Sequence, residues 1–170
     1  MIAGETYSLP TPMTAAEPSR PDLPGPPAEV ELVHRTRFSA AHRLWSDELS
    51  EEENRALYGP CVGDHGHDFE LEVAVSGPLD PRTGMLINLI DLIRVVRERV
   101  FEPCDHKHLN HDVPFLSGRV TTVENVAAAL WTELEQGLAS VSTPHGQPVR
   151  LARLRLWEGP ECSVVLRAQG

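Results

Sequence analysis

Two histidines that flank a single glycine, His65 and His67, are the residues whose types and spacing point most directly to chemistry. Four apolar residues, Phe69, Leu71, Val73 and Val75, alternate with the acidic Asp68, Glu70 and Glu72, and this period of two predicts a half-buried strand. Extended backwards, the alternation puts both imidazoles on the apolar side of that strand. Side chains two residues apart on one face lie about 7 Å apart, so the pair can share one metal ion. On its own, the pattern fits two histidines of an ordinary core equally well.

A third histidine favours the metal site. Within Val30–His42, apolar residues share a parity with His42, which predicts a second strand that ends at this histidine. If the two strands pair antiparallel, the end of the first lies beside the start of the second, and His42, His65 and His67 converge at one edge of the sheet. Three histidines with an open fourth position are typical of catalytic zinc, whereas structural zinc has four protein ligands. The sequence therefore predicts a catalytic Zn²⁺ site.

Composition limits the class of protein. A chain of 170 residues fits one ordinary domain, and a hydrophobic fraction of 41% is enough for a core. The formal charge of −10 argues against a nucleic-acid partner, which would require a basic surface. No run approaches the roughly 18 apolar residues of a membrane span, and no signal-peptide pattern is present. The cysteines lack zinc-finger spacing, which fits a reducing compartment, so we expect a soluble cytoplasmic protein without a membrane partner.

The chain divides into a tail and a domain. Residues 1–28 hold seven prolines, and their few apolar residues show no period, which predicts a disordered or polyproline-like arm. The remaining residues, 29–170, are expected to form one folded domain.

Helix signals follow the second strand, which should end near Gly77. Asn88 is a predicted N-cap of a helix with apolar residues at helical spacing, Leu89 and Ile93 among those expected to face inward, and Pro103 should stop it. A later helix is predicted to begin at Thr121 or Thr122, with Thr121 and Glu124 spaced as a capping box, and to run to about Gly137.

A shorter helix of two turns is predicted after Ser50, because Ser50 and Glu53 also have capping-box spacing. Two closing strands are predicted, roughly over 149–158 and 162–167, joined by a turn at Gly159. Leaving the short helix aside, the order is ββααββ. This order predicts an α+β domain with an antiparallel four-stranded sheet and two helices on one face.

Five motifs in order resemble the family of 6-pyruvoyl-tetrahydropterin synthases and 6-carboxytetrahydropterin synthases. The likeness covers about residues 30–166, and such proteins have the tunnelling fold, in which subunits join their sheets into a barrel. The resemblance implies a homohexamer with active sites between subunits. The motifs are Phe38–Leu44, Cys61 with His65–His67, Gly84–Leu89, Asp105–Asn110 and Thr122–Asn125.

The resemblance also implies roles, residue by residue. The three histidines match the zinc ligands of the family, Cys61 matches the general-base cysteine, and Asp105 and His106 match the pair that assists proton transfer. Cys104 and Cys162, by contrast, are expected to be small buried side chains rather than catalysts.

The implied substrate is a pterin triphosphate, 7,8-dihydroneopterin triphosphate. Zinc would bind the side-chain oxygens of this substrate and acidify the adjacent C–H bond. Glu158 matches the carboxylate that anchors the pterin ring, where it can accept two N–H groups. Thr122 and Glu124 lie in a motif that lines the pterin pocket.

The product is less directly indicated. Three residues separate Cys61 from His65, as in the bacterial 6-carboxytetrahydropterin branch, whereas residues 49–54 and 84–131 resemble the pyruvoyl branch. On the cysteine spacing and an apparently bacterial composition, we expect a lyase that forms 6-carboxy-5,6,7,8-tetrahydropterin and acetaldehyde. The alternative is a 6-pyruvoyl-tetrahydropterin synthase that uses the same substrate.

Two further classes remain open. A zinc hydrolase would attack its substrate with a metal-bound hydroxide and would not need Cys61. A non-catalytic pterin-binding module would keep its pterin affinity without zinc and would show no turnover.

Overall fold

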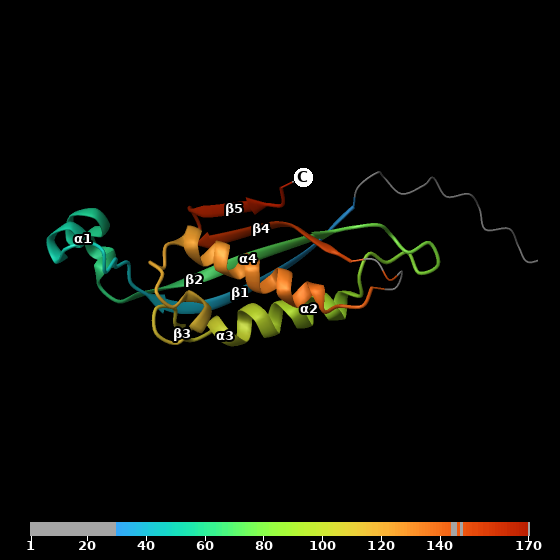
Figure 1. The fold of residues 1–170 in the computed structure, drawn as a ribbon, viewed down its shortest axis with the longest axis horizontal. Coiled ribbons are helices and arrows are strands. Elements are labelled where there is room, and N and C mark those ends of the chain that lie inside the picture. The colour runs from blue at the N-terminus through green and yellow to red at the C-terminus, as the bar shows by residue number, and fades with distance from the viewer. Residues whose placement is uncertain (1–29, 144–145, 147, 170) are drawn as a thin grey trace, which may run out of the picture.

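The computed structural model of this protein describes residues 30–143, 146 and 148–169. Figure 1 shows these residues as a long, twisted sheet with helices packed along one face. The predicted proline-rich arm over residues 1–28 lies outside the described residues. Among the helices of the described ranges, none is long and apolar enough to cross a membrane.

The described residues form a five-stranded sheet in the order β3-β1-β2-β4-β5. Its four long strands pair antiparallel, and the short β3 pairs parallel with β1, so the sheet is mixed. The predicted α+β class and the four antiparallel strands are confirmed. Two residues are too few to show a period, which is why the sequence did not predict β3. The strands are β1 (Glu31–His42), β2 (His65–Ser76), β3 (Lys107–His108), β4 (Arg150–Glu158) and β5 (Ser163–Arg167).

The register of β1 and β2 runs from Glu31 opposite Ser76 to His42 opposite His65. Phe38 and Phe69 lie opposite each other on the buried face, with stacked rings whose centroids are 5.1 Å apart. Mostly polar residues occupy the other face, as the period of two predicts. A slip of one residue would expose the apolar set, so burial specifies this register.

The first long helical segment covers one part of the sheet. It comprises α2 (Leu89–Val96), a π-helical turn over Arg97–Phe101 and α3 (Glu102–Cys104). Asn88 caps it as predicted, but the segment continues through Pro103 to Cys104. Proline is tolerated there because Pro103 lies in the first turn of α3, where its missing N–H is not required.

The buried face of α2 is rotated from the predicted one. Leu92, Val95 and Val96 are buried, whereas Leu89 and Ile93 are 47% and 41% exposed. The expectation that Leu89 and Ile93 face inward was therefore wrong for these two residues, because the helix turns its Val95 side to the neighbouring helix.

That neighbour is α4 (Val123–Ala139), capped by Thr122, whose hydroxyl accepts a hydrogen bond from the Asn125 N–H. Thr121 is not the cap: it is buried, and its hydroxyl donates to the Arg43 carbonyl. The helix continues past the predicted end at Gly137. Gly137 allows close approach to α2, since a Cβ at this position would lie 2.7 Å from Val95 Cγ1.

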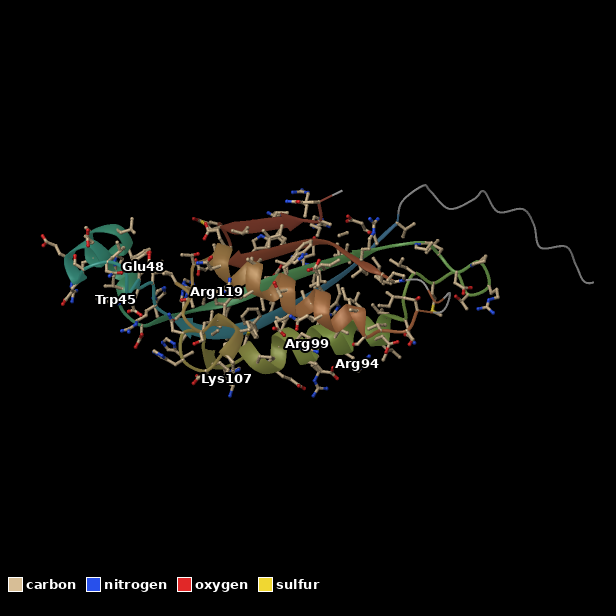
Figure 2. All side chains as sticks on the ribbon, viewed as in Figure 1. Trp45, Glu48, Arg94, Arg99, Lys107 and Arg119 are labelled. Carbon is tan, nitrogen blue, oxygen red and sulfur yellow. The ribbon has the colours of Figure 1, made fainter. Side chains whose placement is uncertain are left out.

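A smaller helical segment, α1 (Glu51–Tyr58), projects from the end of the sheet (Figure 1). Its predicted capping box, Ser50 with Glu53, is confirmed. A 3₁₀ turn, Gly59–Val62, leads from α1 to β2, and a second, Pro114–Leu116, precedes α4. Figure 2 shows Trp45 and Glu48 at the base of the projection, and Arg94 and Arg99 on the helix layer.

Candidate active site

Three imidazoles meet where β1 ends and β2 begins. His42 lies opposite His65 in the register, and His67 follows on the same face of β2. One ring nitrogen from each of the three residues lies within 4.8 Å of the others, a spacing that could hold a metal ion. The structure thus brings His42, His65 and His67 together as the strand parity predicts.

Backbone carbonyls orient two of these rings. His42 Nδ1 lies 2.9 Å from the Thr121 carbonyl oxygen, and His65 Nδ1 lies 2.8 Å from the Gly63 carbonyl oxygen. A carbonyl can only accept, so Nδ1 carries the proton in each ring and Nε2 keeps a free lone pair. This is the usual outer arrangement around a metal-binding histidine.

His42 has the features of a metal ligand. Its side chain is 1% exposed, and its Nε2 atom makes no hydrogen bond to any described residue. The pKa of His42 is lowered to about 4, chiefly by burial and also by the nearby His65 and His67, against the opposing effect of the Thr121 carbonyl. The imidazole is therefore neutral at neutral pH, the form in which histidine binds zinc. An orphaned buried nitrogen in a three-histidine set fits Zn²⁺.

Glu158, the last residue of β4, reaches the same cluster. Its Oε1 atom lies 3.3 Å from His42 Nε2 and 3.9 Å from His67 Nε2. The oxygen is buried and accepts no hydrogen bond from the described residues. A buried carboxylate oxygen without a donor is costly unless a ligand supplies one.

A second pair, Asp105 and His106, lies beside β1. Asp105 Oδ2 is 2.7 Å from His106 Nδ1, and Asp105 Oδ1 accepts a hydrogen bond from the Ser39 N–H at 3.0 Å. The pKa of Asp105 is held below its ordinary value, chiefly by the hydrogen bond from the Ser39 N–H and to a smaller extent by the His106 imidazole. His106 has a φ of 56°, and it is the only residue other than glycine with a positive φ in the described part of the chain.

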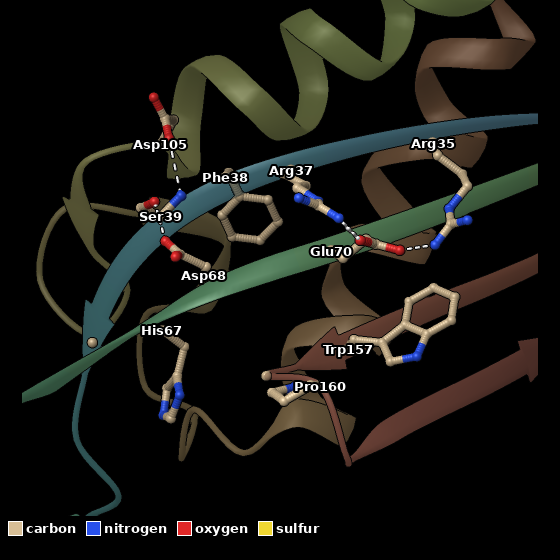
Figure 3. Close-up of a pocket in the computed structure, with 12 residues that line it drawn as sticks. Arg35, Arg37, Phe38, Ser39, His67, Asp68, Glu70, Asp105, Trp157 and Pro160 are labelled. Atoms are coloured by element: carbon tan, nitrogen blue, oxygen red, sulfur yellow. Dashed lines mark hydrogen bonds and ion pairs between the residues drawn. The ribbon is translucent and has the colours of Figure 1, made fainter.

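One residue of the histidine cluster, His67, borders the same cavities as the Asp–His pair. A cavity of about 690 Å³ on the sheet face opposite the helices is lined by both His67 and Asp105, and Figure 3 shows this face. A second cavity, of about 530 Å³, is lined by His67 and His106. Gly66 borders both cavities and leaves this face of β2 without a side chain beside His67.

The remaining predicted site residues lie farther from these contacts. Cys61 is partly exposed in the 3₁₀ turn before β2, where its carbonyl accepts from the Leu44 N–H at 2.7 Å. The metal-binding group found among the described residues does not include it. Thr122 caps α4, and Glu124 is exposed in the first turn of that helix.

Two contributions to the site were not predicted from the sequence. The Thr121 carbonyl orients His42, but any residue type has a carbonyl, so the sequence carries no signal for this contact. Ser39 contacts both Asp105 and Asp68, and in the sequence only its place on the polar parity of β1 hinted at a role.

The fold and the site together define a class: an α+β protein with a three-histidine metal site at the end of two antiparallel strands and an Asp–His pair beside it. Residues 31–169 match the model of the 6-pyruvoyl tetrahydropterin synthase family. The chain belongs to this family and is an enzyme of its lyase type.

Relatives and solved structures agree with this assignment. A 6-pyruvoyl tetrahydrobiopterin synthase of Dictyostelium discoideum is 45% identical over 105 residues, 62% of this chain and 78% of the relative. The enzyme of that name from Poecilia reticulata is 40% identical over 148 residues, 85% of this chain and 95% of the relative. The structure of Caenorhabditis elegans 6-pyruvoyl tetrahydropterin synthase superposes with a TM-score of 0.72 at 31% identity, covering 83% of this chain and 96% of that one.

These comparisons correct the expected product. Relatives that are 40–45% identical bear the name 6-pyruvoyl tetrahydrobiopterin synthase, whereas one from Archaeoglobus fulgidus named for 6-carboxy-5,6,7,8-tetrahydropterin synthesis is 34% identical over 111 residues. The expectation of a 6-carboxytetrahydropterin synthase was therefore wrong. It relied on an apparently bacterial composition and on the spacing of Cys61 and His65. That spacing spans a surface turn, and turn length varies among homologues at little energetic cost.

Proposed function

We propose that this protein is a zinc-dependent 6-pyruvoyl-tetrahydropterin synthase. It would convert 7,8-dihydroneopterin triphosphate into 6-pyruvoyl-tetrahydropterin and release triphosphate, with no external reductant. The observation that carries the proposal is the convergence of three imidazoles beside the buried Oε1 atom of Glu158, with an Asp–His pair nearby. The relatives named for this activity support it.

His42, His65 and His67 would hold the zinc ion, and the Nε2 lone pairs of His42 and His65 are free for it. When bound, zinc supplies Lewis acidity that makes the carbon-bound protons of the substrate side chain easier to remove. The remaining work falls to residues of the chain.

Glu158 would fix the pterin ring. Its Oε1 atom is buried and lacks a donor among the described residues, and the ring offers N–H groups that a carboxylate can accept in pairs. Binding there would place the ring beside His42 and His67, because Glu158 lies 3.3 Å and 3.9 Å from their nitrogens. Thr122 and Glu124 would contribute to the same pocket from the start of α4.

Cys61 would act as the general base, and His106 would give a proton to the substrate or take one from it. Asp105 holds the Nδ1 proton of His106, so the Nε2 atom remains available for transfer. The positive φ of His106 supports this role, since strained backbone is retained mainly where function requires it.

The assembly would be a homohexamer. In the described residues, β3 covers β1 only at Ala40 and Ala41, which leaves most of that edge unpaired, and β5 forms the opposite edge. Two open sheet edges favour pairing with further copies of the chain. Light scattering at micromolar concentration would give a monomer if this part of the proposal is wrong.

Turnover in two cysteine variants tests the chemistry. Wild-type protein with zinc should release triphosphate from 7,8-dihydroneopterin triphosphate, and Cys61→Ala should lose about 10²–10⁴-fold in rate while it keeps zinc. Cys162→Ala is the matched control, because Cys162 is exposed rather than buried as predicted and lies outside the histidine cluster. Full activity in Cys61→Ala would favour a zinc hydrolase, and pterin binding without turnover would favour a binding module.

A further inference from the structure

One residue of β1 holds both members of the Asp–His pair. The Ser39 N–H donates to Asp105 Oδ1 at 3.0 Å, and the Ser39 carbonyl accepts from the His106 N–H at 2.7 Å. Any shift of Ser39 must therefore move Asp105 and His106 together.

The Ser39 side chain is anchored on the other strand. Its hydroxyl donates to Asp68 Oδ1 at 2.6 Å, and the two residues are direct partners in the β1–β2 register. Asp68 follows His67 in sequence and lies on the opposite face of β2. Figure 3 shows the resulting sequence of contacts, from Asp105 through Ser39 to Asp68, beside His67.

The short distance indicates a strong contact. A hydroxyl that donates to a carboxylate at about 2.6 Å is charge-assisted and roughly twice as strong as a neutral hydrogen bond. Both side chains line the cavities that reach His67. The contact also braces a strained neighbour, because His106 keeps its φ of 56° through its attachment to Ser39.

We propose that Asp68 is a positioning residue, which acts through Ser39 to set the location of the Asp105–His106 pair relative to the metal-binding strand. This inference rests on the proposed function, because it assumes that His106 transfers a proton. Asp68 itself need not touch the substrate. Its effect arises from geometry, since a displacement of about 1 Å in a reacting group can reduce a rate by about 10²-fold.

Steady-state kinetics of three variants test the inference. Asp68→Ala removes the acceptor and should lower kcat by about 10–100-fold, with KM within about 3-fold of wild type. Asp68→Asn keeps an oxygen that accepts from Ser39 and should recover most of kcat. Glu72→Ala is the matched control, because Glu72 lies on the same face of β2, forms an ion pair with Arg153 on β4 and lines neither cavity. It should leave kcat unchanged.

Hydrogen exchange supplies a second measurement that does not depend on turnover. The His106 amide, which donates to Ser39, should exchange faster in Asp68→Ala than in wild type or Glu72→Ala, at equal zinc content. If wild type turns over and Asp68→Ala matches Glu72→Ala in kcat, this inference is overturned while the proposed function stands. If wild type shows no turnover, the proposed function fails, and the inference fails with it.

Discussion

Protonation of His42 should destabilise the metal-free protein as the pH falls below about 6.5. The pKa of His42 is lowered from 6.5 to about 4 in the folded protein, chiefly by burial. Between these values the unfolded chain binds more protons than the folded one, so stability is fully present above the ordinary pKa and is lost as the pH falls towards 4. One pKa unit corresponds to about 1.4 kcal/mol, which gives a loss of about 2 kcal/mol at about pH 5 and about 3 kcal/mol at the limit.

Urea unfolding of the zinc-free protein at about pH 7 and about pH 5 measures this loss. Other groups also titrate over this range, so the informative quantity is the difference in pH dependence between wild type and His42→Gln, which cannot titrate at this position. His111→Gln is the matched control, because His111 is an exposed histidine outside the three-histidine cluster. Equal pH dependence in wild type and His42→Gln would refute the claim that His42 is buried in its neutral form.

Three further predictions concern single residues. Gly137→Ala should destabilise the fold by about 1–3 kcal/mol despite the better helix propensity of alanine, because the new Cβ would lie 2.7 Å from Val95 Cγ1. Thermal denaturation measures this loss, and the double variant Gly137→Ala/Val95→Ala should recover part of it. Cys104 should resist alkylation in the folded protein at about pH 8, because burial, with a smaller contribution from Glu133, raises the pKa of its thiol to about 12. Peptide mass mapping that finds Cys104 labelled as fast as Cys162 would contradict this. His106→Gly should abolish turnover and raise the free energy of unfolding by up to about 1 kcal/mol, since glycine adopts a φ of 56° without strain. The midpoint of denaturant unfolding measures this increase.

The metal cluster could be predicted from the sequence because strand physics leaves few alternatives. Alternation fixes which face each histidine occupies, and the apolar faces of β1 and β2 must be buried together. These two requirements put the three imidazoles on one face, and antiparallel pairing of the end of β1 with the start of β2 then places His42 opposite His65. Helix caps at Ser50 and Asn88 followed from equally local rules.

Other features required tertiary information. Glu158 reaches the histidines only because β4 lies beside β2, an order that local patterns do not encode. The Asp105–His106 pair is attached through Ser39 backbone groups, which are the same in every residue type. The length of the turn after Cys61 pointed to the wrong product, because a surface turn can change length while the metal site stays in place.

Mass spectrometry of the reaction products tests the central claim most directly. Zinc-loaded protein incubated with 7,8-dihydroneopterin triphosphate should yield triphosphate and a pterin with the mass of the 6-pyruvoyl-tetrahydropterin. Because that product retains the whole side-chain carbon skeleton, no acetaldehyde should form. Acetaldehyde together with the 6-carboxy compound, or recovery of unchanged substrate, would contradict the account.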